Sequence, residues 1–140
     1  MTPGYAPRFR LRAFGSLEQS ARETLLRLLL EALVAVNIAH LRAHPATPRL
    51  MDSSVRYEPD DPGREEWKDI AETLSRGAGD CKDLVAWRLA ELRIGGEHAA
   101  VARVEFHEAG DGRVLQHMTV RRASGLIEDP SRALGMLALR

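Results

Sequence analysis

The hydrophobic pattern of the chain changes from a helical period to a strict alternation about two thirds of the way along. Apolar residues recur at helical spacing in 16–43, 65–76 and 80–94, and then alternate in 99–107. Spacings of three and four residues predict helices, whereas alternation predicts a strand with one buried face. Helices that precede a run of strands predict an α+β fold.

The alternating part of the chain predicts a small antiparallel sheet. A turn signal at 109–112 leads to a partner strand at 114–122, and a second turn leads to a third strand at 126–128. Four residues of the first strand share one face, which we expect to be buried: Ala100, Ala102, Val104 and Phe106.

The segment 16–43 predicts a long first helix, in which Ser16 and Gln19 form a capping box. Its second half is apolar nearly all round, so it lies either in the core or against a partner subunit. The core is the simpler expectation, and a homo-oligomer through the 16–43 helix is the alternative. Five apolar residues repeat along the segment at helical spacing: Leu25, Leu29, Ala32, Val36 and Ala39.

The overall composition limits the classes of partner. Twenty acidic and twenty basic residues leave no net charge, which argues against nucleic acid and against an anionic membrane surface. Arg27, Glu31 and Asn37 interrupt the apolar run 25–41, so we expect no membrane span. A single cysteine and an N-terminus without a hydrophobic signal segment are compatible with the cytoplasm.

The length of 140 residues predicts one domain, 1–140, because a chain of this size can bury most of its apolar surface. Within it we expect an N-terminal arm at 1–15 and a long, proline-rich loop at 45–64. Loops of this length usually have a purpose, so we expect this one to fold over a site or along its edge. The motifs that suggest chemistry lie within 65–135.

The only cysteine, Cys81, lies where a glycine-rich turn enters a helix, in the run Gly-Ala-Gly-Asp-Cys-Lys-Asp. Asp80 is a suitable N-cap, and Asp83 lies in the capping-box position. Gly77 and Gly79 allow a sharp turn and leave room beside the sulfur. Unpaired N–H groups and the dipole of the first helical turn favour a thiolate, which predicts a lowered thiol pKa. The same N–H groups can bind an oxyanion.

A cysteine nucleophile also needs a base, and five histidines are available. His117 is the best candidate because the middle of a strand can hold its ring rigidly. Asp129 follows after a turn and can orient the imidazole, as the third group of a catalytic triad does. His107 lies on the preceding strand, and the other three are expected to cap a helix or to face water: His40, His44 and His98.

The cysteine motif resembles that of the transglutaminase-like superfamily, relatives of the papain-like cysteine enzymes. That family carries Gly-Asp-Cys-x-Asp at a helix N-terminus, followed by a histidine and then an aspartate on strands. Cys81 matches the nucleophile, His117 the base and Asp129 the orienting acid. The resemblance covers about residues 65–135, and 125–132 also looks like small members encoded by phages and prophages.

Some residues around this motif have two interpretations. Trp67 and the Glu-Thr-Leu that follows it match residues that bacterial members often carry, and Trp67 either forms a wall of the site or packs in the core. Asp83 is expected to cap its helix rather than to act as the third triad member. Arg132 either binds a carboxylate or faces solvent.

The resemblance implies a papain-like domain in which the nucleophile helix packs on a small antiparallel sheet. It implies acyl chemistry on an amide bond of a protein or peptide, with hydrolysis favoured over crosslinking and with no cofactor. A zinc site is not expected, because there is no second cysteine. Three alternatives stay open: a cysteine that is merely a buried hydrophobic residue, a non-catalytic virion or assembly module, and a regulatory domain with a redox-sensitive thiol.

Overall fold

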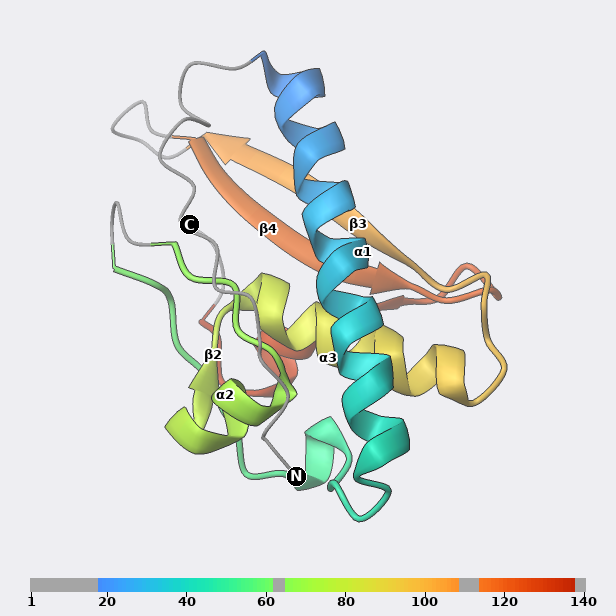
Figure 1. Cartoon of the computed structure of the whole chain (residues 1–140). Helices are drawn as coiled ribbons and strands as arrows, with labels where there is room; N and C mark the ends of the chain where they lie inside the picture. The colour runs from blue at the N-terminus through green and yellow to red at the C-terminus, as the bar shows by residue number, and fades with distance from the viewer. Residues whose placement is uncertain (1–17, 62–64, 109–113, 138–140) are drawn as a thin grey trace.

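The computed structural model describes residues 18–61, 65–108 and 114–137 (Figure 1). The expected arm at 1–15, Ser16 and the turn at 109–112 lie outside these residues. The mixture of helices and small sheets confirms the predicted α+β class. The elements are α1 (Gln19–Ala43), the 3-10 helix η2 (Leu50–Asp52), β1 (Arg56–Tyr57), α2 (Ile70–Arg76), β2 (Ala78–Gly79), α3 (Cys81–Ile94), β3 (Val101–Glu108), β4 (Val114–Arg121), β5 (Ile127–Glu128) and α4 (Pro130–Ala133).

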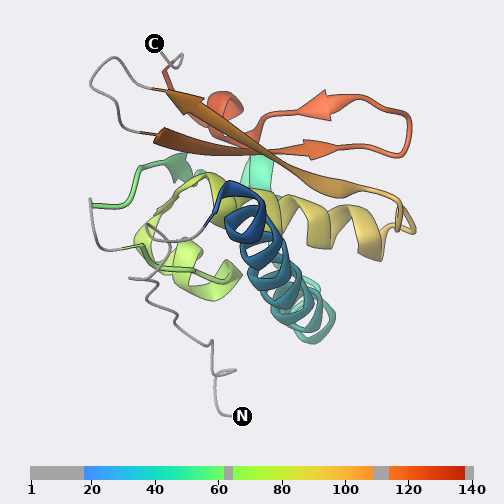
Figure 2. The ribbon, with the colours of Figure 1, turned by 90° about the horizontal axis from the view of Figure 1, so that it is seen from above.

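The predicted antiparallel sheet is present, with its strands in the order β3-β4-β5. Helices α1 and α3 cover the same face of this sheet, and α1 crosses α3 (Figures 1 and 2). Ala100 and Ala102 are buried on the covered face, as predicted, while Val104 and Phe106 are half-buried and pack against the same core. The alternation therefore predicted the inward face of β3 correctly.

The apolar repeat from which helix α1 was predicted lies mainly on the solvent side of the helix. Leu25, Ala32 and Ala39 are exposed, and Leu29 and Val36 are half-buried. Because the helix is apolar nearly all round in its second half, its pattern does not specify which side faces the core. A neighbouring stripe forms the buried side: Leu26, Leu30, Leu33, Val34 and Asn37.

Helix α1 also has the length and composition of a membrane-crossing segment, with a mean hydropathy of 1.6 over an 18-residue stretch. Core helices of globular proteins often share this property. Here the helix packs on α3, and Arg27 donates to the carbonyl of Ala102 at 2.7 Å, which joins α1 to the sheet.

Helix α2 is shorter than its pattern predicts, since it begins at Ile70 rather than at residue 65. The backbone N–H groups of Glu66 and Lys68 donate to the side chains of Asp60 and Asp83, at 2.9 and 2.8 Å. These bonds hold the preceding residues outside the helix. The Asp69 side chain then caps α2 by accepting from a backbone N–H of its first turn. Tertiary hydrogen bonds have overridden the local helical pattern.

The long loop contains regular structure that its composition does not predict. It includes η2 and then β1, which pairs in parallel with β2 through Tyr57 and Gly79. The backbone N–H of Tyr57 also donates to the carbonyl of Leu134, at 2.9 Å. Because β2 immediately precedes α3, this pairing places the loop beside the start of the cysteine helix.

Candidate functional site

Cys81 is the first residue of α3, and the predicted capping box is present there. The Asp80 side chain accepts from the backbone N–H of Asp83, and the Asp83 side chain accepts from the backbone N–H of Asp80. As the first helical residue, Cys81 carries one of the N–H groups for which the helix itself has no acceptor. Gly77 has a φ of 69°, so the predicted sharp turn does require glycine.

Gly79 serves close packing rather than space beside the sulfur. A Cβ atom at this position would lie 3.1 Å from the Thr73 side chain and 3.2 Å from the Cβ of Asp83. The missing side chain therefore lets α2 approach the start of α3.

The structure brings His117 and Asp129 together. Nε2 of His117 lies 2.8 Å from Oδ2 of Asp129, and the histidine side chain is only 4% exposed. A carboxylate has no hydrogen to donate, so Nε2 carries the proton. In the neutral ring Nδ1 then holds the lone pair, and it is buried without a hydrogen-bond partner among the described residues. Such an atom can accept a proton from a nearby donor.

Cys81 lies against the same strand as His117. The backbone of Met118, the next residue, lies close enough to the Cys81 sulfur to favour its charged form. Met118 belongs to the buried core, and the cysteine packs against that core while keeping part of its surface exposed. The start of α3, strand β4 and Asp129, the N-cap of α4, therefore lie close together.

The thiol of Cys81 does not have the lowered pKa that its helical position predicts. Burial raises the pKa of Cys81 to about 12, and the negative charge of Asp80 adds to this effect. Lys82 and the Met118 backbone act in the opposite direction and are outweighed. The local prediction was wrong because it counted the helix dipole and omitted the loss of hydration. At neutral pH the sulfur rests as a thiol.

We expect the alkylation of Cys81 by iodoacetamide to reflect this resting state. Only the thiolate reacts, so the rate in the native protein should rise about tenfold per pH unit from pH 7 to pH 10. The urea-unfolded chain should instead level off above about pH 9, since an unperturbed thiol has a pKa near 8.5. Intact-mass spectrometry measures both profiles on the single cysteine. A native profile that levels off below pH 8 would contradict a raised pKa.

Tyr57 is a member of the site that the sequence did not reveal. Burial raises the pKa of its phenol to about 12, and negative charge at Cys81 adds to the shift, ahead of Asp80 and Asp60. Tyr57 pairs with Gly79, so β1 runs beside the residues that immediately precede Cys81. The only signal in the sequence was the length of the loop that carries it.

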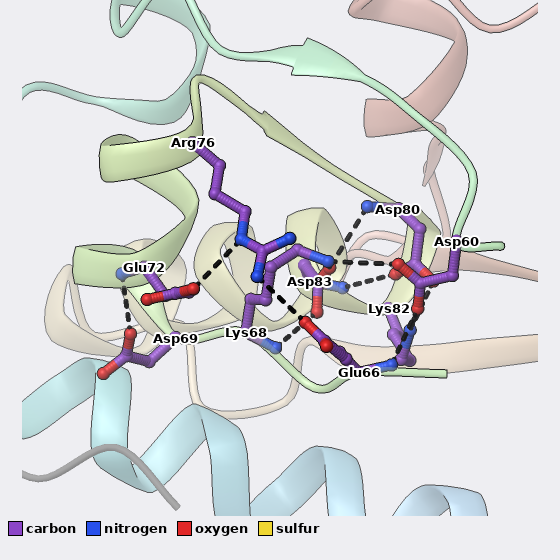
Figure 3. A network of polar contacts seen from close by, with 9 residues as sticks. All are labelled: Asp60, Glu66, Lys68, Asp69, Glu72, Arg76, Asp80, Lys82 and Asp83. Atoms are coloured by element: carbon purple, nitrogen blue, oxygen red, sulfur yellow. Dashed lines mark hydrogen bonds and ion pairs between the residues drawn. The ribbon is translucent and has the colours of Figure 1, made fainter. Parts of the chain in front are cut away.

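A buried network of charges surrounds the start of α3 (Figure 3). The printed sequence contains two lysines, and both lie in this network. Nζ of Lys68 lies 3.1 Å from carboxylate oxygens of both Asp60 and Asp83. Nζ of Lys82 lies 2.7 Å from Asp60 and also binds Asp80. The network thus fastens the loop residue Asp60 to the capping box of α3.

The carboxylates of this network differ in their affinity for protons. Burial by itself would raise the pKa of Asp60, but the charge and hydrogen bond of Lys82, the backbone N–H of Glu66 and the charge of Lys68 together lower this pKa to about 2. Burial raises the pKa of Asp80 well above its usual value, and the neighbouring charge of Asp83 acts in the same direction. Three carboxyl groups face two ammonium groups, and Asp80 is the one whose raised pKa favours the protonated form.

The same three carboxylates, of Asp60, Asp80 and Asp83, have oxygens within 4.8 Å of one another, a spacing that suits a metal ion. However, the ammonium groups of Lys68 and Lys82 already lie between these oxygens at hydrogen-bond distance. A cation placed there would have to displace a lysine. The cluster is better described as a set of buried ion pairs.

Trp67, Arg132 and His107 pack against or pair with other residues of the chain. Trp67 is 1% exposed and packs in the core, with Nζ of Lys82 5.6 Å from its ring centroid. Nε of Arg132 lies 3.4 Å from Asp129, so this arginine binds a carboxylate, although a carboxylate of its own chain. His107 pairs with Glu105 of the same strand at 3.0 Å, and its side chain is 43% exposed to solvent.

Among the hollows of the described part of the chain, two are large, and Cys81 lines neither of these two. One, of about 610 Å³, borders Gly79 and carries acidic residues that include Glu58 and Asp61. The other, of about 560 Å³, lies between the ends of α1 and α3 and is bordered by Arg122. The candidate site is therefore defined by its side chains and not by these hollows.

Comparison of the chain with protein-family models, with curated proteins and with solved structures found no match. The chemistry of the site consequently rests on its own geometry. That geometry consists of an imidazole oriented by Asp129, whose Nδ1 has no hydrogen-bond partner among the described residues, and a cysteine that lies against Met118, the next residue of the same strand.

Proposed function

We propose that this protein carries out acyl chemistry on an amide bond with Cys81 as nucleophile, His117 as base and Asp129 as the group that orients the base. The observation that carries the proposal is the 2.8 Å contact between His117 and Asp129. It assigns the lone pair to Nδ1, which is buried without a partner among the described residues. A strand histidine held only for structure would be expected to use both ring nitrogens.

The proposed first step begins from a neutral thiol. The proton of the Cys81 sulfur moves to Nδ1 of His117 while the sulfur attacks the carbonyl carbon, which forms a carbon–sulfur bond. The resulting imidazolium is stabilised by Asp129 and returns the proton to the leaving amine as the carbon–nitrogen bond breaks. A resting thiol requires the base to act during the attack, because no thiolate is stored beforehand.

The oxyanion of the tetrahedral intermediate needs donors near the sulfur. The backbone N–H of Cys81 lies at the start of the helix, where the dipole also favours negative charge. The Tyr57 phenol is a second candidate donor, since its raised pKa keeps it protonated. These roles are part of the proposal and follow from the position of each group beside Cys81.

The thioester then reacts with water or with an amine. Both lysines of the chain are buried, with side chains 7% and 3% exposed, so neither can serve as an acceptor for a neighbouring copy. An enzyme with this surface would not crosslink itself through lysine. We therefore propose hydrolysis, in a papain-like or transglutaminase-like domain, as the function that the site supports best.

The activated ester p-nitrophenyl acetate offers a direct test. We expect a rapid release of p-nitrophenolate, and quenched samples should carry an acetyl group on Cys81 by peptide mass spectrometry. The Cys81→Ala variant should lose both signals, and Ser53→Ala, which alters a hydroxyl in the loop, should keep them. Release that persists unchanged in Cys81→Ala, or acetylation at other residues only, would reject the cysteine as nucleophile.

A further inference from the structure

Strand β5 is very short, although it carries the residue that precedes Asp129. It consists of Ile127 and Glu128, which pair with two residues of β4. One further backbone hydrogen bond closes the turn before it, from the N–H of Arg122 to the carbonyl of Leu126, at 2.8 Å. So few backbone contacts leave the position of Asp129 dependent on what the Glu128 side chain binds.

Two arginines from different elements hold the Glu128 carboxylate. Nε and Nη2 of Arg88, on α3, lie 2.9 and 3.4 Å from its two oxygens, which is a bidentate contact. Nη1 of Arg122, which follows β4, lies 3.0 Å from one of the same oxygens. Burial by itself would raise the pKa of Glu128, but the hydrogen bonds and charges of Arg88 and Arg122 lower it below its usual value. The carboxylate is therefore ionised at neutral pH.

The two arginines are themselves held by other carboxylates. Nη1 of Arg88 lies 3.3 Å from Glu91, and Nε and Nη2 of Arg122 each lie 2.7 Å from Glu97. The side chains of Arg88 and Arg122 are 20% and 29% exposed. Such a partly buried network of bidentate contacts fixes its members more firmly than an isolated ion pair at the surface does. Glu128 is thus bound at a defined point.

Arg88 joins the two parts of the candidate site. It lies seven residues after Cys81 on α3, about 10 Å along the helix and about two turns away, so both residues face the same side. At the other end of its contact, Glu128 precedes Asp129, whose Oδ2 lies 2.8 Å from Nε2 of His117. One bidentate contact therefore connects the helix that carries the sulfur to the strand that leads to the orienting acid.

We infer that Glu128 is a positioning residue, which holds Asp129 against His117 through its contacts with Arg88 and Arg122. The inference rests on the proposed function, in which Asp129 orients the base. A misplacement of about 1 Å can cost about 100-fold in rate, even when its origin is distant from the reacting atoms. Because Glu128 acts through Asp129 and not on the substrate, its loss should lower kcat and leave KM nearly unchanged.

Two substitutions of Glu128 separate its position from its charge. Glu128→Gln removes the charge and keeps the length of the side chain, whereas Glu128→Asp keeps the charge and shortens the reach. Both should lower kcat for p-nitrophenyl acetate by about 10 to 100-fold, with KM changed less than about twofold. Arg88→Lys keeps a cation but loses the bidentate contact, so it should lower kcat by about tenfold or more.

The tautomer of His117 provides a readout that needs no turnover. At about pH 8, where an unperturbed imidazole is neutral, ring-nitrogen NMR of the unmodified chain should show the proton on Nε2. Loss of these signals in His117→Ala assigns them. In both Glu128 variants the signals should move towards a mixture of the two tautomers, because Asp129 no longer fixes the proton on Nε2.

Glu31→Gln is the matched control for these variants. It breaks another bidentate contact of α3, between Arg93 and Glu31, which leads to α1 and not to Asp129. It should leave the ring signals of His117 in place and change kcat by less than about twofold.

The outcomes separate this inference from the proposed function. Unchanged ring signals in Glu128→Gln and Glu128→Asp would overturn the inference, whatever the hydrolytic activity. So would a loss confined to Glu128→Gln, since charge alone would then suffice, or an equal shift in Glu31→Gln. If Cys81→Ala keeps its activity while the ring signals move as expected, the acyl chemistry fails and the positioning of Asp129 stands. Should circular dichroism show that a Glu128 variant is unfolded, the ring signals of Arg88→Lys decide.

Discussion

Replacing Lys82 with methionine should lower the free energy of unfolding by about 3 to 5 kcal/mol. The Lys82 side chain is 3% exposed and neutralises Asp60 and Asp80, so its loss leaves buried carboxylates with only Lys68 to balance them. Removing one partner of a buried ion pair is costly because the remaining charge is neither hydrated nor paired. Urea denaturation followed by circular dichroism measures the change.

Arg76→Met is the matched control for this experiment. It removes a cation of the same region, but Arg76 is 49% exposed where it binds Glu66 and Glu72, so the loss should stay below about 1 kcal/mol. The double variant Lys82→Met with Asp80→Asn should recover part of the stability, since asparagine keeps the helix cap and removes the unpaired charge. If the double variant is less stable than Lys82→Met alone, the charge balance is not what holds the start of α3.

Replacing His117 with alanine should reduce kcat/KM for p-nitrophenyl acetate by about 10² to 10⁴-fold. The effect is large because the resting thiol, with a pKa of about 12, has no other route to a thiolate at neutral pH. Asp129→Asn should cause a smaller loss, because the amide still caps α4 but no longer selects the proton on Nε2. Steady-state release of p-nitrophenolate measures both variants.

His107→Ala controls for the loss of a histidine from the same sheet. His107 also contacts a carboxylate, Glu105, at 3.0 Å, yet it lies on β3 and is 43% exposed. It should therefore change kcat/KM by less than about twofold. A larger loss for His107→Ala than for His117→Ala would transfer the role of base to the other histidine.

Local hydrogen bonding made several features predictable from the sequence. The cap at Asp80 and Asp83 involves four consecutive residues, so the pattern alone predicts it, and the structure contains it. The antiparallel order of β3, β4 and β5 likewise follows from alternation and short turns. The pairing of His117 with Asp129 was predictable because both belong to this local meander.

Long-range packing decided features that the sequence left open or predicted wrongly. Helix α2 starts late because Asp60 and Asp83 take the backbone N–H groups that precede it. The thiol pKa follows burial and the charge of Asp80 rather than the helix dipole. Tyr57 reaches the site only through the pairing of β1 with β2, which no local signal predicts.

The order of helices and strands, the helix cap and the inward face of β3 were determined by the sequence itself, because each depends on neighbours a few residues away. The tertiary structure alone decided which side of α1 faces the core, where both lysines lie and how strongly Cys81 holds its proton. Burial and charge are summed over residues that are distant along the chain, and that sum exists only once the segments have packed together.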